Sequence, residues 1–212
     1  MELGQKLSTK PTPDNDVLAG TNAANTINGL AGSDLIRAQG GKDLVDGGDG
    51  SDFLDGGPGN DTLKGGLGLD LVTYAGNVAV VIDLSGTKDT AKRGSEIDTL
   101  IGIEGGLGSS KNDTFKGDAA NNEFQGKAGK DIFTGGAGRD TYDFNAVADS
   151  PVGANRDVIK DFVHLSDIID VAGIDADTTL PGDQSFRWVG RATLTGAAQL
   201  GYYVSGGNTI VR

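Results

Sequence analysis

The chain contains no cysteine among its 212 residues, so disulfides cannot stabilise the fold and no thiolate can bind a metal or act as a nucleophile. The N-terminal stretch MELGQKLSTKPTPDND has no apolar run and predicts neither a signal peptide nor a membrane span. Basic residues are few: 18 Lys and Arg stand against 30 Asp and Glu, for a net charge of −12. This balance argues against a nucleic-acid partner and favours a chain that collects cations.

Catalytic motifs are missing as well. The only histidine is His164, so a helical His-Glu-x-x-His zinc motif cannot form. No Gly-x-Ser-x-Gly elbow occurs, and a lone histidine in DFVHLSD is typical of a solvated loop. Paired carboxylates are abundant, but the repeat described next gives them another role. We therefore predict that this chain is not an enzyme and expect any catalytic domain of its parent protein to lie outside it.

Glycine and aspartate are what the chain has in excess. Its 36 glycines are more than twice the share in an average protein, which is about 7%. They recur in a nine-residue unit, Gly-Gly-x-Gly-x-Asp-x-aliphatic-x, which is complete at residues 47–55, 56–64 and 65–73. The acidic slot is filled by Asp16, Asn25, Asp34, Asp43, Asp52, Asp61 and Asp70, and in a second register by Asp113, Asn122, Asp131 and Asp140. A flexible linker, the usual explanation of such a composition, needs no apolar residue at every ninth position.

Each unit predicts a turn followed by a short strand. In Phe53-Leu54-Asp55 the middle side chain points inward and its neighbours outward, because side chains alternate along a strand. Glycine supplies the positive φ that the turn requires. Two units then complete a coil, which stacks on the previous coil at about 4.8 Å. Carboxylates two units apart, such as Asp34 and Asp52, lie in adjacent coils and repel each other unless a cation separates them.

The nonapeptide resembles the calcium-binding repeat of RTX proteins, an identification by match to a known pattern. The resemblance covers most of the chain and implies an all-β fold. This fold is a right-handed parallel β-roll in two blocks, with an intervening strand pair and a C-terminal β-rich cap. It also implies calcium as the cofactor, with about five ions or more, bound between turns by carboxylates and backbone carbonyls.

The resemblance assigns the calcium ligands to the sixth-position carboxylates and the carbonyls of the early turn positions. In the first block these are Gly29, Ala31, Asp34, Ala38, Gly40, Asp43, Gly47, Gly48, Asp49, Gly50, Asp52, Gly56, Gly57, Pro58, Gly59, Asp61, Gly65, Gly66, Leu67, Gly68 and Asp70. In the second block they are Asp113, Asn122, Gly126, Ala128, Asp131, Gly135, Ala137 and Asp140, and a looser correspondence adds Asp149 and Asp157. Asparagine keeps an oxygen but lacks the charge, so its sites are expected to be weaker.

The composition divides the chain into five segments. Residues 1–13 are interpreted as a linker or a vector-derived remnant, 14–73 as the first roll block and 108–142 as the second. Residues 74–107 break the register with two predicted strands, 77–84 and 97–103, joined by a polar loop over 85–96.

The final segment, 143–212, resembles the roll-capping segment of serralysin-type secreted metalloproteases, most clearly in DVIKDF, SDIIDV and GDQSFRWVG. That family usually continues with another strand and an export signal, so we expect a trimmed fragment.

Three functions are compatible with these patterns. The first is a calcium-binding module of a secreted bacterial protein, which folds in extracellular calcium and aids export through a type I secretion apparatus. The second is a polyuronate-binding module of a secreted polysaccharide-modifying enzyme, with an extracellular polysaccharide as partner. It ranks lower because Lys64, Lys116, Lys127, Lys130 and Arg139 are scattered among acids. The third is an adhesin or matrix spacer.

Overall fold

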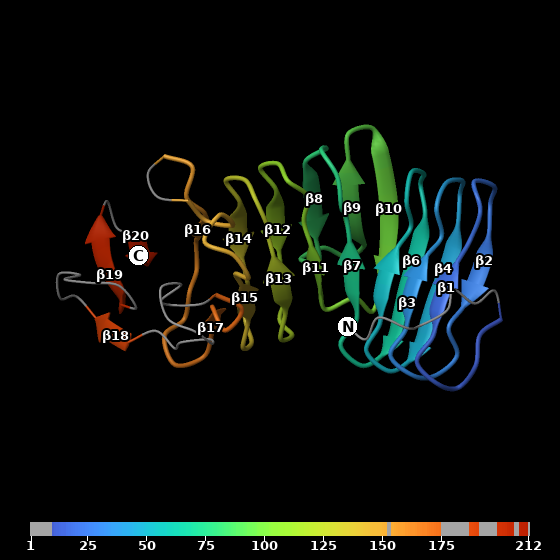
Figure 1. Cartoon of the computed structure of the whole chain (residues 1–212), viewed down its shortest axis with the longest axis horizontal. Coiled ribbons are helices and arrows are strands. Elements are labelled where there is room, and N and C mark those ends of the chain that lie inside the picture. Colours follow the sequence, from blue (N-terminus) through green and yellow to red (C-terminus); the bar gives the residue numbers. More distant parts are fainter. Residues whose placement is uncertain (1–9, 152–153, 175–186, 191–198, 206–207, 212) are drawn as a thin grey trace, which may run out of the picture.

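The computed structural model describes residues 10–151, 154–174, 187–190, 199–205 and 208–211, the last three ranges by their backbone alone. These residues form β-strands and turns without a helix, so none of them lies in a helix long and apolar enough to cross a membrane. The strands stack side by side along the long axis, from the first repeats at one end to the C-terminal strands at the other (Figure 1).

The first repeat block alternates between two sheets. Sheet A begins with β1 (Val17–Ala19), β3 (Leu35–Arg37), β5 (Phe53–Asp55) and β7 (Leu71–Thr73), and sheet B with β2 (Thr26–Asn28), β4 (Leu44–Asp49) and β6 (Thr62–Leu67). Neighbouring strands are parallel, and Ile36 pairs with Leu54 and Val45 with Leu63, an offset of two repeat units. In β3 and β5 the middle side chain is buried while its neighbours are more exposed. The predicted parallel roll is confirmed.

The turns depend on glycine at their fourth position. Position four is glycine with positive φ in every complete or near-complete unit, from Gly32 (φ 103°) to Gly138 (φ 111°). At Gly50 (φ 132°) a Cβ atom would overlap the carbonyl oxygen of Gly32 in the preceding coil. Glycine is therefore required there for two reasons, the positive φ of the backbone and the close stacking of the coils.

Substitution Gly50→Ala is expected to lower the free energy of unfolding in saturating calcium by about 3 kcal/mol or more. Positive φ costs an L-residue about 1–2 kcal/mol, and the overlap with Gly32 adds the cost of forcing two coils apart. Gly76 is the matched control, because it has a similar φ of 129° but no atom within 4 Å of an added Cβ. Gly76→Ala should therefore cost only about 1–2 kcal/mol. Urea unfolding measures both, and equal losses would contradict the stacking argument.

The segment between the blocks differs from the expected strand pair and loop. It contains β8 (Val80–Asp83), β9 (Asp89–Arg93) and β10 (Glu96–Ile101), which form an antiparallel meander in sheet B. The prediction of a loop over 85–96 is wrong, because β9 lies within it. Only Ala91 of β9 is fully buried, so the polar sequence of β9 does not show the pattern of a strand. Segment β9 is a strand because it pairs with β8 on one side and with β10 on the other.

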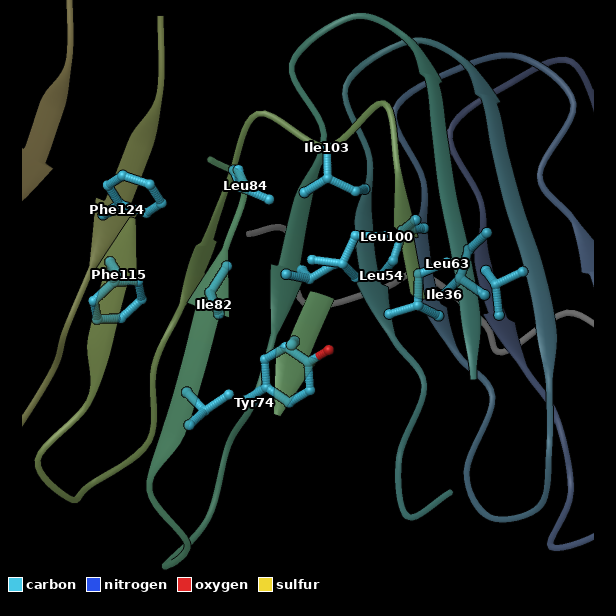
Figure 2. Close-up of a cluster of buried hydrophobic side chains, with 14 of the residues drawn as sticks. Ile36, Leu54, Leu63, Tyr74, Ile82, Leu84, Leu100, Ile103, Phe115 and Phe124 are labelled. Atoms are coloured by element: carbon cyan, nitrogen blue, oxygen red, sulfur yellow. The ribbon is translucent and has the colours of Figure 1, made fainter. Parts of the chain in front are cut away.

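The meander widens sheet B relative to sheet A. In sheet A, β7 pairs directly with β11 (Gly105–Leu107), whereas in sheet B all three meander strands separate β6 from β12 (Thr114–Lys116). Two strands more than a regular roll needs add about 10 Å to that sheet. Large side chains fill the extra space between the sheets: Figure 2 shows Tyr74, Leu84, Leu100 and Ile103 lying between the two halves of the core.

The roll continues through the second block into the C-terminal segment. Sheet B adds β14 (Ile132–Thr134) and β16 (Val158–Ile159), and sheet A adds β13 (Glu123–Gln125), β15 (Thr141–Asp143) and β17 (Ile168–Asp170). The aromatic residues of this block are fully buried and stack along the axis, with ring centroids of Phe115 and Phe133 4.9 Å apart.

A separate three-stranded sheet follows, made of β18 (Arg187–Gly190), β19 (Gln199–Ser205) and β20 (Asn208–Val211). Most of the GDQSFRWVG run, residues 182–186, lies outside the described residues. The five segment boundaries stay predictions.

Candidate calcium sites

Acidic side chains line both edges of the roll in a regular array, which we call the acidic ladder. In each rung one carboxylate oxygen accepts a hydrogen bond of 2.7–3.2 Å from a backbone N–H of the preceding coil. One edge carries Asp34, Asp52, Asp70, Glu104, Asp140 and Asp167, and the other carries Asp43, Asp61, Asp98, Asp113, Asp131 and Asp157. The ladder therefore places most of the sequence-predicted carboxylates in stacked turns.

The second oxygen of most ladder carboxylates has no partner within the protein. Among the described residues, Oδ2 is buried without a hydrogen bond in Asp34, Asp43, Asp52, Asp61, Asp70, Asp131 and Asp157. In the turn 47–52, a Cβ at Gly47 would overlap Oδ2 of Asp52, so the carboxylate folds back over the first glycine of its own turn. A buried anionic oxygen without a partner is costly, and a cation bound at the turn would remove that cost.

Burial changes the acidity of these groups. Desolvation raises the pKa of Asp34, Asp61 and Asp70 to about 6, that of Asp157 to about 7 and that of Asp131 to about 8. Neighbouring carboxylates contribute to the raised pKa of each of them, as Asp157 does for Asp131. Without a counter-ion, ionisation of these side chains near neutral pH therefore costs the folded state free energy.

The donor atoms at these turns fit calcium. Carboxylate oxygens and glycine-rich turns with accessible carbonyls are the ligands that Ca²⁺ prefers, and it accepts six to eight of them. The described residues contain no cluster of three or more His, Cys, Asp or Glu side chains, so backbone carbonyls have to complete any site. The residues that would hold the ions are the ladder carboxylates and the carbonyls of the adjacent turns. The carbonyl ligands named from the sequence stay predictions.

Several predicted ligands differ from the common arrangement. Asp113 has both oxygens occupied, since Ser109 donates to each and Val80 N–H donates to Oδ1. Asn122 accepts from Asp118 N–H and donates to the carbonyl of Glu104. Asp149 caps its own loop by accepting from the N–H groups of Asn145 and Ala146, whereas Asp157 stands in the ladder beside Asp131.

The ladder also contains Asp98, Glu104 and Asp167, which the repeat pattern does not predict. Glu104 Oε2 accepts from Asp70 N–H at 2.8 Å, and Asp98 Oδ1 accepts from Asp61 N–H at 2.8 Å. A signal was present for the aspartates. Asp98 and Asp167 each precede a strand residue by two positions, the spacing of the repeat, but the glycine turn before them is lost.

Two mainly parallel sheets, built from nine-residue units on both sides of the meander and with an acidic ladder on each edge, define the chain as a repeat β-roll. A family model described as peptidase M10 serralysin C terminal matches residues 19–204, and the chain therefore belongs to this family. The family is the non-catalytic, calcium-binding RTX repeat region of secreted metalloproteases. No curated protein matches the chain.

Two aspartates of one turn offer a sharp test of the ladder. Asp52 is fully buried with an unpartnered Oδ2, whereas Asp49 is exposed and joins its neighbours through its backbone. Asp52→Ala should raise the calcium concentration at the folding midpoint several-fold, because it removes a carboxylate that we predict to be a calcium ligand between adjacent coils. Asp49→Ala keeps the carbonyl and should leave the midpoint unchanged. Calcium titrations followed by circular dichroism measure both, and equal shifts would contradict the assigned register.

Proposed function

We propose that this chain is the calcium-binding module of a secreted bacterial protein, and that it folds on meeting extracellular calcium. The observation that carries the proposal is the row of buried, unpartnered carboxylate oxygens along both edges of the roll. Most of these oxygens face the first glycine of a turn, and burial raises the pKa values of their carboxyl groups, so the folded state demands cations. Family membership supports both the metal and the secreted location.

The size of the calcium effect suits a folding switch. At about 1 mM calcium and a site dissociation constant of about 10⁻⁴ M, each ion adds about 1.4 kcal/mol to the stability of the folded state. About five sites contribute about 7 kcal/mol, which is comparable with the whole stability of a domain, about 5–15 kcal/mol. In a cytosol with little free calcium this contribution disappears and the carboxylates repel one another. An unfolded chain inside the cell suits passage through a type I secretion apparatus, and folding outside stabilises the parent protein.

The polyuronate alternative gains no support from the hollow on sheet A. The outer face of sheet A has a shallow hollow of about 180 Å³ lined by Phe53, Glu123 and Asp143, among others. Two carboxylates in this hollow repel a polyanion such as polyuronate.

Direct binding measurements test the proposed function. Equilibrium dialysis of the full chain at about 1 mM calcium should show about five or more bound ions. Magnesium at the same concentration should neither bind comparably nor displace calcium, since it prefers a rigid octahedral shell and dehydrates reluctantly. The triple variant Asp34→Ala, Asp52→Ala, Asp70→Ala removes one edge of the first block and should lower the number of bound ions. Binding of fewer than one ion per chain, or equal binding of magnesium, would overturn the proposal.

A further inference from the structure

We propose that an arginine side chain takes the place of a calcium ion where the roll is interrupted. The guanidinium of Arg93 supplies positive charge near Asp98, and the hydroxyl of Tyr74 donates a hydrogen bond to its carboxylate. The meander β8–β10 therefore keeps its fold in calcium-free solution. This inference rests on the proposed calcium function of the flanking coils, and it concerns a part of the roll that does not share their need for a metal ion.

Asp98 differs from the calcium-type rungs beside it. Its Oδ1 accepts from the backbone N–H of Asp61, as in the rest of the ladder, but its Oδ2 accepts from the hydroxyl of Tyr74 at 2.7 Å. Both residues are buried, with Tyr74 1% and Asp98 3% exposed. In Asp61, one coil earlier, the equivalent oxygen has no partner. Each oxygen of the Asp98 carboxylate therefore has a protein donor, and neither is left buried without a partner as in Asp61.

Arg93 supplies the positive charge at the same place. Its Nη2 donates to the carbonyl of Gly57 at 2.6 Å, and its guanidinium lies 5.8 Å from the centre of the Tyr74 ring. It also forms an ion pair of 2.9 Å with Glu96, and its side chain is only 15% exposed. Gly57 is a turn residue whose carbonyl the repeat pattern assigns to calcium. A fixed guanidinium thus takes over a turn carbonyl that a metal would otherwise hold, next to a buried carboxylate.

The ladder carboxylate on the other side of the meander also has protein donors for both of its oxygens. Asp113 is the ladder residue that accepts from β8, through Val80 N–H at 2.7 Å. Its oxygens also accept from the N–H of Ser109 at 2.6 Å and from its hydroxyl at 3.0 Å. The two rungs that border the meander on this edge are therefore both satisfied without a metal, whereas Asp61 on one side and Asp131 on the other keep unpartnered oxygens.

The connectivity of the meander also favours folding without calcium. Strands β8, β9 and β10 pair antiparallel through short connections, so contacts such as Ile82 with Ala91 span few residues. Regular coils instead pair strands that are two repeat units apart in the sequence, and they place like charges side by side. A short loop costs less entropy to close, and the meander buries Val80, Ile82, Ala91 and Leu100. It can therefore serve as the base on which the calcium-dependent coils stack.

Hydrogen exchange of the full chain in chelator, read by mass spectrometry, tests the inference. We expect amides of residues 80–101, and those of 57–67 that Arg93, Asp98 and β10 contact, to exchange at least about tenfold more slowly than those of 17–49 and 114–142. Arg93→Ala and Tyr74→Phe should abolish this difference and raise the calcium concentration needed for folding. Lys92→Ala, which changes the exposed neighbour of Arg93 on the same strand, should preserve the protection.

The outcomes separate the two proposals. If calcium still folds the chain but residues 80–101 gain protection only together with the coils, the meander is not independent and this inference is wrong. If protection in chelator survives Arg93→Ala, the meander is independent but its guanidinium does not replace a metal, and the assignment of Arg93 is wrong. If the whole chain is protected in chelator, the calcium-dependent function itself fails.

Discussion

In chelator the chain is expected to lose most of its β-structure, and millimolar calcium is expected to restore it. The reason is the acidic ladder: seven buried carboxylate oxygens have no partner in the described residues, and the chain carries a net charge of −12. Removal of the cations leaves stacked carboxylates whose ionised forms repel each other at neutral pH. The apolar column between the sheets is narrow, with no more than two buried apolar side chains per nine-residue unit, and cannot offset that repulsion alone.

Far-ultraviolet circular dichroism during a calcium titration measures this transition. The signal of β-structure should appear cooperatively, because each coil is stabilised only by its neighbours. Magnesium is the control cation and should leave the spectrum close to that in chelator. A full β-signal in chelator would contradict the calcium switch, as would an equal response to magnesium.

A chain that ends at Tyr142 is expected to remain largely unfolded at calcium concentrations that fold the full chain. The cut removes β16 and β17, which pair with β14 and β15 and extend both sheets. It also removes Phe162, whose ring centroid lies 6.4 Å from that of Tyr142. The end coil would then expose its aromatic interior and its unpaired strand edges. Asp131 and Asp140 would lose the acidic partners Asp157 and Asp167 that accept from their N–H groups.

A chain that ends at Ile174 is the matched control. It keeps both sheets complete through β17 and removes only the part of the chain that includes β18–β20. Its calcium midpoint should stay within about twofold of the full chain, whereas the midpoint of the shorter chain should rise at least about tenfold or not be reached. Folding of the Tyr142 chain at an unchanged calcium concentration would show that 143–174 is not needed to close the roll.

The repeat itself is determined by the sequence, because the information is local. The nine-residue period, with an apolar residue two positions after each acidic residue, predicts which side chains face inward. Ile36, Leu54 and Phe124 are fully buried as expected. Glycine at the fourth turn position predicts a residue with positive φ, as observed at Gly50 and Gly68. Two units per coil then follow from the alternation between sheets, and with them the stacking of Asp34 on Asp52.

Tertiary structure decided what happens where the period fails. Strand β9 is polar and β11 places Gly106 in the apolar slot, so neither shows the local pattern of a strand. Glycine is favoured at position 106 because a Cβ there would lie 2.9 Å from the carbonyl oxygen of Val72 in β7 and 2.7 Å from Cδ1 of Ile82 in β8. Glu104 and Asp98, within the interruption, join the ladder through Asp70 and Asp61, which precede it in the sequence. Such contacts depend on how the meander widens sheet B, and no local spacing in the sequence encodes that geometry.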